Sequence, residues 1–530
     1  MNFPLVLGLD SSTQSLSAVV VDRRNATILK AVTVTYKTDP RLTGHGLDPE
    51  LLLLPPRSSG EADQPPLLFL ASLEALFSDL TAAGVDLGQI GLVNVSAQQH
   101  GHVYLSSGFS PALDQLRSGK NTDQPLAQVL AGAFSHLRAP IWKTSNTVAE
   151  AEVLRRAAGG TSGMIELTGS DSPLRFSGAV FRRVFTHEPG VWDATVRLHL
   201  LSSFLPAVLT ANPDVPADWG NGSGTSLMDY KKKEWDERLL SAAAKDLPGG
   251  GAALKRKLTP LAAPLALAGT VAPWFVKKFG FSPEARVLIG SGDNPQTKVL
   301  VEGDLLSLGT SFVMMVDTGS GLVDGRGWGN AMYDGVGRPF LFGCRTNGAL
   351  VWDRLRQKAG LAAKDFITTE AALAAQAPGS VMSLWQPDVE SFPPSPSFPL
   401  KVRGNDESFA KVFPGCVDSA LGLVYRSSLP WLENKSSPLA VTGGPTASPG
   451  ILKRIAAIWN RPVVTIGTTG AALGAAAAAL AFDGVTIPLL PPSVPVEPNG
   501  ADVEVLHRPG GYLDQLEEFL AQAVQQAGGK

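Results

Sequence analysis

The sequence predicts an α/β fold in which one strand–turn–strand unit occurs twice. Apolar, β-branched runs alternate with helical stretches along the chain, a pattern typical of layered α/β proteins. The first hairpin covers residues 5–21 and has a polar turn at 10–14. A similar hairpin covers residues 304–316 and has a small, hydroxyl-bearing turn at 309–311. A repeat separated by about 300 residues indicates one duplicated fold, whose two turns are expected to face each other.

Composition indicates a large folded protein without a strong excess of either charge. The 530 residues are 44% hydrophobic and 18% charged, which excludes disorder throughout and allows a large core. The 45 basic and 48 acidic residues give a net charge of −3, which argues against broad binding to nucleic acid or anionic membranes. Cys344 and Cys416 are too few for a disulfide framework, and with seven histidines a Cys/His zinc site is not expected. We expect small molecules as partners, no nucleic acid, no membrane, and a monomer or homodimer.

Two segments bear on localisation. The first ten residues lack a basic region and include Asp10, which does not fit a signal peptide. The longest apolar run, Ala471–Phe482, is rich in alanine and glycine and is too short to span a bilayer. These features predict a reduced, soluble, cytoplasmic protein.

The first half is expected to contain several strands and one long helix. Apolar and β-branched runs predict strands at 5–9, 18–21, 28–36 and 90–96. Leu67–Ala83 is predicted to be a helix, and the Pro-, Ser- and Gly-rich sequence at 48–66 to be a loop.

The second half continues the alternation after its hairpin. The elements expected there are a strand at 339–343, a helix at 349–359, a strand and turn at 441–446, and helices at 450–459, 469–482 and 512–527. The last of these has the spacing of a peripheral docking helix, and the Pro-rich region 385–405 is expected to be irregular. The boundary between the two halves is predicted near residue 298.

The turn that begins at Asp10 is acidic and carries hydroxyl groups. Its amides and the hydroxyls of Ser11, Ser12 and Thr13 have the chemistry to bind phosphate oxygens, and Asp10 that to hold magnesium, directly or through water. The alternative is an ordinary hairpin turn, because Asp, Ser and Thr are common turn residues. The matching position of the second turn in the duplicated fold favours two phosphate clamps.

A carboxylate and an amide stand side by side at Asp293-Asn294, after an apolar run and two glycines. A carboxylate held in a narrow place at a strand end has the chemistry of a general base for a hydroxyl nucleophile. The alternative is a helix cap or an Asx turn.

Polar residues also follow the strand at 90–96, in the sequence Gln98-Gln99-His100-Gly101-His102. Ligands gather at such strand ends in open α/β sheets, and Gln and His offer hydrogen bonds to a polyhydroxyl substrate. A solvated or capping histidine is the alternative. A further strand runs into Gly443-Gly444, where missing side chains allow a flat ring or a phosphate to approach, or merely a tight turn.

Common nucleotide and hydrolase fingerprints do not occur. The sequence contains no G-x-x-x-x-G-K-[ST], G-x-G-x-x-G, G-x-S-x-G or H-E-x-x-H. Readings as a P-loop protein, strict Rossmann protein, serine hydrolase or zincin therefore have no motif to support them.

The ordered motifs together resemble those of the FGGY carbohydrate kinases, and most closely those of the xylulokinases. The motifs that carry the resemblance are Leu7-Gly8-Leu9-Asp10-Ser11-Ser12-Thr13-Gln14, Ser96-Ala97-Gln98-Gln99-His100-Gly101, Leu167-Thr168-Gly169 through Arg175-Phe176-Ser177-Gly178, Gly292-Asp293-Asn294-Pro295, Ser307-Leu308-Gly309-Thr310-Ser311, Phe342-Gly343-Cys344-Arg345-Thr346-Asn347-Gly348, Thr442-Gly443-Gly444 and Gly470-Ala471-Ala472-Leu473-Gly474. The resemblance extends from about residue 5 to about residue 480.

The resemblance implies a duplicated actin-like, ribonuclease-H-like ATPase fold with two domains around a central cleft. It implies an N-terminal sugar-binding domain at 1–297 and a C-terminal nucleotide-binding domain at 298–530. Asp293 would be the catalytic base, and the residues that would bind the sugar with it are Gln99, His100, Arg175 and Asn294. The cofactors would be ATP and magnesium, contacted by Asp10, Ser12, Thr13, Gln14, Gly309, Thr310, Gly443, Gly444, Pro445 and Ser448, with Asp10 serving the metal.

The implied activity is ATP-dependent phosphorylation of D-xylulose on its terminal hydroxyl. One alternative is another FGGY kinase that acts on ribulose, a related ketose or a polyol, because specificity lies in small pocket changes. An alternative of another class is a non-catalytic actin-like nucleotide sensor. The intact Asp293-Asn294 pair together with both turns favours an enzyme.

Overall fold

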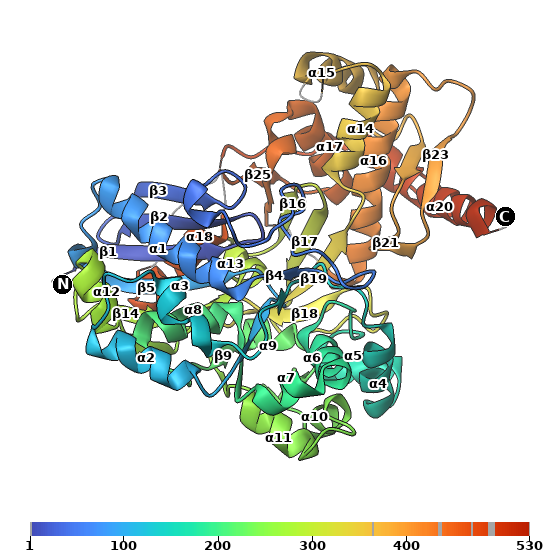
Figure 1. Cartoon of the computed structure of the whole chain (residues 1–530). Helices are drawn as coiled ribbons and strands as arrows, with labels where there is room; N and C mark the ends of the chain where they lie inside the picture. Colours follow the sequence, from blue (N-terminus) through green and yellow to red (C-terminus); the bar gives the residue numbers. More distant parts are fainter. Residues whose placement is uncertain (1–2, 363–364, 433–436, 468–469, 486–492, 529–530) are drawn as a thin grey trace. The chain divides into compact units, whose positions relative to one another are not determined.

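The computed structural model describes residues 3–362, 365–432, 437–467, 470–485 and 493–528 (Figure 1). Its contacts divide the chain into two compact units. Unit 1 comprises Met1–Leu300, Ala331–Pro339 and Gly470–Leu489, and unit 2 comprises Val301–Asn330, Phe340–Thr469 and Leu490–Lys530. The sequence predicted two continuous domains, 1–297 and 298–530. By contacts, however, unit 1 also includes Ala331–Pro339 and Gly470–Leu489 from the second half of the chain. One of them carries helix α18 (Ala471–Phe482), which packs on strands of unit 1.

A twisted mixed sheet forms the centre of unit 1. Its strands are β1 (Leu5–Ser11), β2 (Ser15–Asp22), β3 (Thr27–Thr35), β5 (Ile90–Ala97), β13 (Leu267–Thr270), β14 (Arg286–Leu288) and β15 (Ser291–Gly292). The strand order is β13-β14-β5-β1-β2-β3, and β15 also pairs with β5. Strand β2 is antiparallel to both β1 and β3, whereas β5 runs parallel to β1, β14 and β15.

Alternation along β1 gives this sheet two buried faces. Leu7 and Leu9 belong to a large core that also contains residues of helix α1 (Pro66–Ala82), which packs against β2 and β3. Val6 points to the opposite face and packs with Ala476 of α18. Because successive side chains of a strand point to opposite faces, a strand with both faces covered is apolar throughout.

Helix α18 lies unusually close to β1 because small residues form the contact. A Cβ atom placed on Gly8 would lie 2.0 Å from the carbonyl oxygen of Ala472 and 2.6 Å from the nitrogen of Ala476. The Asn94 side chain of β5 also donates to the Ala475 carbonyl at 3.0 Å. The alanine-rich sequence that excluded a membrane span therefore serves tight helix-on-sheet packing.

The remaining elements of unit 1 surround the sheet. The helices are α2 (Phe109–Ser118), α3 (Leu126–Val129), α4 (Val148–Ala157), α5 (Thr161–Thr168), α6 (Ser177–His187), α7 (Pro189–Ala194), α8 (Leu201–Thr210), α9 (Trp219–Ser223), α10 (Glu237–Ala243), α11 (Gly250–Lys257), α12 (Pro273–Phe279) and α13 (Asp293–Val299). The short strands include β4 (Asp63–Gln64), β6 (His102–Leu105), β7 (Ala139–Pro140), β8 (Arg197–Leu200), β9 (Ala217–Asp218), β10 (Met228–Asp229), β11 (Glu234–Trp235) and β12 (Leu261–Ala262).

Unit 2 repeats the sheet topology of unit 1. Its strands β19 (Pro339–Arg345), β17 (Phe312–Asp317), β16 (Leu305–Leu308), β24 (Leu439–Thr442) and β25 (Val463–Thr465) lie in this order. The first three are antiparallel to one another, and β24 is parallel to β16 and β25. The same order and the same directions occur in β3-β2-β1-β5-β14 of unit 1. The predicted duplication is therefore confirmed at the level of strand topology.

Helices of unit 2 pack around the long helix α16 (Phe409–Ser428). The others are α14 (Ala349–Lys358), α15 (Phe366–Ala375), α17 (Pro449–Trp459), α19 (Gly500–His507) and α20 (Tyr512–Gly528). A buried ion pair of 2.8 Å joins Arg454 of α17 to Asp418 of α16. The helices predicted at 67–83, 349–359, 450–459 and 512–527 are confirmed as α1, α14, α17 and α20. The helix predicted at 469–482 is confirmed from Ala471 onward, and Thr469 lies outside the described residues.

Two predictions of irregular structure were wrong. The loop at 48–66 contains β4, which pairs with β7. The Pro-rich region 385–405 contains β21 (Glu390–Ser391), β22 (Pro394–Ser395), β23 (Phe398–Val402) and the end of β20 (Ser383–Gln386). These short strands form small two-stranded ladders in which proline is tolerated. The partner of β4 lies far along the chain, whereas β20–β23 and β21–β22 pair locally, in strands too short or too rich in proline to show a strand pattern in the sequence.

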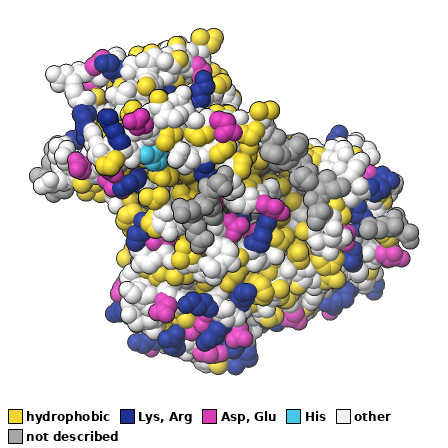
Figure 2. Space-filling model, turned by 180° about the vertical axis from the view of Figure 1, so that it is seen from behind, with side chains coloured by type: hydrophobic (Ala, Val, Ile, Leu, Met, Phe, Trp, Pro, Cys, Tyr) yellow, Lys and Arg dark blue, Asp and Glu magenta, His cyan; other side chains and the backbone are white. Residues whose placement is uncertain are grey.

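The surface mixes charges of both signs. Basic and acidic side chains are interspersed with apolar ones on the face seen in Figure 2, in keeping with the small net charge. Among the described residues, no helix combines the length and the apolar character needed to cross a membrane.

The close approach of α18 predicts that Gly8 tolerates no side chain. Gly8→Ala should lower the free energy of unfolding by about 1–3 kcal/mol, because the new Cβ would overlap backbone atoms of α18 and the helix would have to shift. Urea unfolding measures the loss. Gly132→Ala is the matched control, since nothing lies within 4 Å of its Cβ position. Equal stability of the two variants would contradict the packing described.

Candidate active site

The candidate site of unit 1 lies where parallel strands end. Asp10 is on β1 beside Ser96 of β5, and β15 pairs with β5 at the same level. Asp293 follows β15 directly, as the first residue of α13. The carboxyl ends of parallel strands meet at one sheet edge, where ligands of open α/β sheets bind. The structure therefore brings together two of the predicted carboxylates, separated by 283 residues in sequence (293 − 10).

The Asp293 carboxylate is held by backbone and side-chain donors. Its Oδ1 accepts hydrogen bonds from the Asn294 amide at 2.9 Å, the Gln99 amide at 3.3 Å and Asn294 Nδ2 at 3.2 Å. Burial nevertheless raises the pKa of Asp293 to about 6, with the two backbone donors opposing the shift. A carboxylate with a pKa just below neutrality is ionised at pH 7 and retains appreciable basicity.

Asp10 is perturbed more strongly. The pKa of Asp10 is raised to about 7, mainly by burial and secondly by the negative charge of Asp293. The hydrogen bond from Ser96 Oγ opposes this shift. That bond is 2.7 Å long. Two carboxylates that repel each other in a partly desolvated place are a site where a cation lowers the energy.

Gln99 holds its neighbours in place. Its Oε1 accepts from Asn294 Nδ2 at 2.9 Å, and its Nε2 contacts the sulfur of Met332 at 3.6 Å. The side chain of Gln99 is buried, whereas Asn294 is partly exposed. Gln99 was predicted to bind substrate, but these contacts suit it to positioning Asp293 and Asn294.

His100 is a neutral, oriented imidazole. Its Nδ1 lies 2.8 Å from the carbonyl oxygen of Gly224, so Nδ1 carries the proton and Nε2 carries a lone pair. Burial and the nearby charge of Arg175 lower the pKa of His100 to about 3. The ring stacks on Phe176 at 4.6 Å between centroids. The predicted pair His100 and Arg175 therefore does lie together, and Phe176 and Gly224 are supporting residues that were absent from the predicted site residues.

A second buried carboxylate supports the strand end before Asp293. Asp218 accepts from Ser291 Oγ at 2.6 Å and caps α9 through the amides of Gly220 and Asn221. Burial raises the pKa of Asp218 to about 6. A Cβ on Gly292 would lie 2.3 Å from Gln99 Cγ, which explains the glycine before Asp293. The N-cap position of Asp218 before a glycine-rich turn was the available signal.

The hydroxyls of the first turn are engaged within unit 1. Ser12 Oγ donates to the Ser15 carbonyl at 3.0 Å and accepts from the Gln14 amide at 3.3 Å. Thr13 Oγ1 donates to Gln98 Oε1 at 3.0 Å and accepts from Trp142 Nε1 at 2.8 Å. Gln14 is exposed, and the Trp142 side chain is 44% exposed. Trp142 was absent from the predicted site residues.

Unit 2 contains the corresponding turn and strand end. Gly309 and Thr310 are exposed in the turn between β16 and β17. Gly443 follows β24 with φ of 109°, and a Cβ there would lie 2.2 Å from the Leu308 carbonyl oxygen, so glycine is required.

A pocket of about 570 Å³ adjoins this strand end. It is lined by Ser307, Thr442, Gly443, Gly444, Thr446, Thr465, Ile466 and Gly467. Pro445 lies in the same short helix as Gly444. Ser448 is buried, caps α17 by accepting from the Ile451 amide, and is hydrogen-bonded to Glu370 of α15. Ser448 was predicted to line the nucleotide site, and these bonds give it a structural role at the edge of that site.

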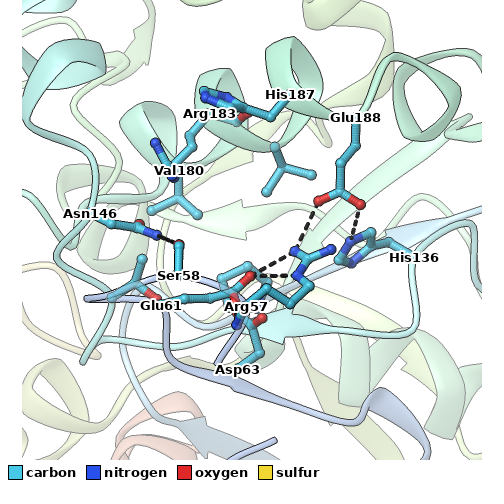
Figure 3. A pocket seen from close by; sticks show the side chains of 13 residues that line it. Arg57, Ser58, Glu61, Asp63, His136, Asn146, Val180, Arg183, His187 and Glu188 are labelled. Atoms are coloured by element: carbon cyan, nitrogen blue, oxygen red, sulfur yellow. Dashed lines mark hydrogen bonds and ion pairs between the residues drawn. The ribbon is translucent and has the colours of Figure 1, made fainter. Parts of the chain in front are cut away.

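A second pocket, of about 300 Å³, lies on unit 1 beside β4 (Figure 3). Its carboxylates are paired: Glu61 and Glu188 both contact Arg57, at 2.7 and 2.9 Å. Asp63 pairs with Arg138 at 2.7 Å. This network anchors β4, the short strand that the sequence did not predict.

Comparisons with known proteins find similarity to sugar kinases. No protein-family model matches the chain. Xylulose kinase 2 of Arabidopsis thaliana is 34% identical over 314 residues, which are 58% of this chain and 53% of that protein. The xylulose kinase of Mus musculus is 27% identical over 482 residues, 88% of this chain and 83% of that protein.

The chain is similar in sequence to proteins named xylulose kinase. The solved structure of ligand-bound xylulose kinase from Lactobacillus acidophilus has a TM-score of 0.79 and 18% identity, covering 98% of this chain and 99% of that one. The predicted actin-like FGGY fold is confirmed. The matched regions span about half the length of the relatives that exceed 30% identity.

The raised pKa of Asp10 predicts a pH-dependent stability. The pKa of Asp10 is about 7 in the folded protein, against an ordinary 3.8, so its ionisation costs stability as pH rises from 4 through 7. In the absence of metal and nucleotide, Asp10→Asn should melt at least about 2 °C higher than the original protein at pH 8, and at nearly the same temperature at pH 4. Thermal unfolding across this range measures the difference.

Glu504→Gln, an exposed change in unit 2, controls for the loss of one negative charge. A melting difference for Asp10→Asn that stays constant from pH 4 to pH 8 would contradict the assignment.

Proposed function

We propose that the protein is an ATP-dependent kinase that phosphorylates D-xylulose on its terminal hydroxyl and releases D-xylulose 5-phosphate and ADP. The relatives named xylulose kinase support this proposal, as does the fold shared with such kinases. The observation that carries it is the position of Asp293 at a strand end, beside Asp10 and close to a neutral, oriented His100.

Asp293 is proposed as the general base. A sugar hydroxyl is a poor nucleophile at neutral pH, and a carboxylate with a pKa of about 6 takes its proton as the oxygen bonds to the γ-phosphorus of ATP. The bond from that phosphorus to the bridging oxygen breaks, and ADP leaves. Asn294 and Gln99 keep the carboxylate pointed at one place.

His100, Arg175 and Asn294 are proposed to bind the sugar. His100 Nε2 accepts a hydrogen bond from a sugar hydroxyl, since its Nδ1–H is used by Gly224. Arg175 supplies donors, and Asn294 supplies an amide next to the reacting hydroxyl. Such fixed donors and acceptors orient the hydroxyl for transfer.

Magnesium is proposed as the cofactor at Asp10. Burial and, after it, repulsion from Asp293 raise the pKa of Asp10, and a nearby cation would relieve both. Among the described residues, no group of three or more His, Cys, Asp or Glu side chains is arranged to hold a metal, so phosphate and water oxygens would complete the coordination. When bound, the ion neutralises phosphate charge.

The second half of the chain is proposed to bind ATP, and the first half the sugar. Gly443 and Gly444 line the pocket of unit 2, where the backbone is open to a flat ring or a phosphate. Gly309, Thr310 and Pro445 adjoin these glycines in the turn and the short helix. Ser12, Thr13 and Gln14 form the corresponding turn of unit 1. The Ser12 and Gln14 amides bond within the turn and shape it, and the Thr13 amide is proposed to donate to a phosphate oxygen.

Sugar-dependent ADP release tests the function. D-Xylulose should stimulate release above that seen with D-ribulose and xylitol, and Asp293→Asn should reduce the stimulated rate at least 10²-fold while ATP binding persists. Release with ribulose or xylitol alone would favour another FGGY substrate. ATP binding without release for any sugar would favour the nucleotide sensor. Near-normal turnover of Asp293→Asn would overturn the assignment of the base.

His100 gives a second prediction. His100→Ala should raise the KM for D-xylulose roughly 5- to 100-fold and leave the KM for ATP nearly unchanged, because one hydrogen bond in a desolvated place is lost. Steady-state kinetics with each substrate varied in turn measure the split. His187→Ala, at an exposed histidine of the same unit, is the control. An unchanged sugar KM in a folded variant would make His100 structural.

A further inference from the structure

The geometry points to Gln64 as a positioning residue that makes Thr13 a hydrogen-bond acceptor for a hydroxyl of the sugar. The inference rests on the proposed function and deepens it. Gln64 lies on β4, in a segment expected to be an irregular loop, and its side chain is completely buried. A continuous series of hydrogen bonds joins Gln64 to the turn of β1.

The orientation of the Gln64 amide is determined by two carbonyl groups. One end of this amide lies 2.8 Å from the Thr13 carbonyl oxygen and 2.9 Å from the Leu52 carbonyl oxygen. Carbonyl oxygens only accept hydrogen bonds, so this end is the nitrogen. The oxygen of Gln64 therefore faces Gln98.

The orientation of Gln64 determines which atom donates and which accepts at each further hydrogen bond of the series. Gln98 Nε2 donates to Gln64 Oε1 at 2.8 Å, which turns Gln98 Oε1 towards Thr13. Thr13 Oγ1 donates its only proton to that oxygen at 3.0 Å. Trp142 Nε1, which can only donate, donates a hydrogen bond to Thr13 Oγ1 at 2.8 Å. We call these four side chains, Gln64, Gln98, Thr13 and Trp142, the amide relay.

The amide relay decides what Thr13 can bind. The Thr13 hydroxyl hydrogen is engaged in the bond to Gln98, and one lone pair accepts from Trp142. One lone pair therefore remains to accept from a donor. A phosphate oxygen is an acceptor and gains nothing from this hydroxyl, whereas a sugar hydroxyl is a donor. Thr13 is only partly buried, and the half-exposed ring of Trp142 lies next to it. The phosphate role first expected of the Thr13 hydroxyl thereby falls to the Thr13 amide, since the Ser12 and Gln14 amides bond within the turn.

Gln64 is anchored from its other side. Its neighbour Asp63 lies in the pocket shown in Figure 3 and is held by Arg138 at 2.7 Å. Strand β4 also pairs with β7, which ends two residues before Trp142. One short strand thus fixes both ends of the amide relay, because buried hydrogen-bond networks that are fully satisfied are rigid.

Calorimetry without ATP tests the relay on binding alone. D-Xylulose is titrated into the full chain and into Gln64→Leu, Thr13→Val and the double variant. Each single variant should weaken binding roughly tenfold, and the double variant should be no weaker than Thr13→Val, because Gln64 acts through Thr13. Additive losses would overturn the inference. Gln98→Leu interrupts the same relay if Gln64→Leu does not fold.

A second measurement does not depend on sugar binding. The chain has ten tryptophans, and Trp142→Phe identifies the Trp142 indole N–H signal in nitrogen-15 spectra. Gln64→Leu should shift that signal although Gln64 bonds to Gln98 and Trp142 to Thr13, and an unmoved signal would overturn the inference. Gln386→Leu, at a buried glutamine of unit 2, should change neither the signal nor the affinity. Failure of the original protein to bind D-xylulose would count against the proposed function, while the spectra would still decide the relay.

Discussion

Two carboxylates desolvated at the end of one sheet are the constraint on which the candidate site of unit 1 depends. Asp10 and Asp293 reach the same edge because β1, β5 and β15 run parallel. The register of these strands places Asp10 and Ser291 beside the same residue of β5, Ser96, although they are far apart in sequence. Each additional contact, from Ser96 to Asp10 or from Gln99 to Asp293, supports the ionised form against burial. The pair is therefore poised to respond to a positive charge and to accept a proton near neutral pH.

Duplication explains why two unlike candidate sites, one in each unit, share one strand topology. In both units a hairpin turn lies beside the end of a parallel strand, as Asp10 lies beside β5 and Gly309 beside β24. In unit 1 the positions are filled by carboxylates, amides and imidazole, which suit a polyhydroxyl compound and proton transfer. In unit 2 they are filled by glycine and hydroxyl groups, which suit close approach of a large ligand to the backbone. The fold supplies the positions, and side chains divide the tasks.

Much of the polar machinery supports other polar groups. Gln99 supports Asn294, Asp218 supports Ser291, and Gln64 supports Gln98. Such residues contribute direction: they determine which atom of a neighbour donates and which accepts. Because a buried amide left without partners is costly, each of these contacts restricts its neighbour to one orientation.

The sequence alone determined the alternation of strands and helices, the duplicated hairpins, and the residues at the strand ends, because these follow from local apolar patterns and motif order. It did not reveal β4, since its partner lies far away in the chain, or the strands at 385–405, which are short and rich in proline. It did not assign α18 to unit 1, because an alanine-rich helix carries no local sign of the glycine it packs against. Only the tertiary structure decided the protonated nitrogen of His100, the pKa values of Asp10 and Asp293, and the direction of the Thr13 hydroxyl. Each of these depends on burial and on partners brought together by folding, which a linear order of residues does not contain.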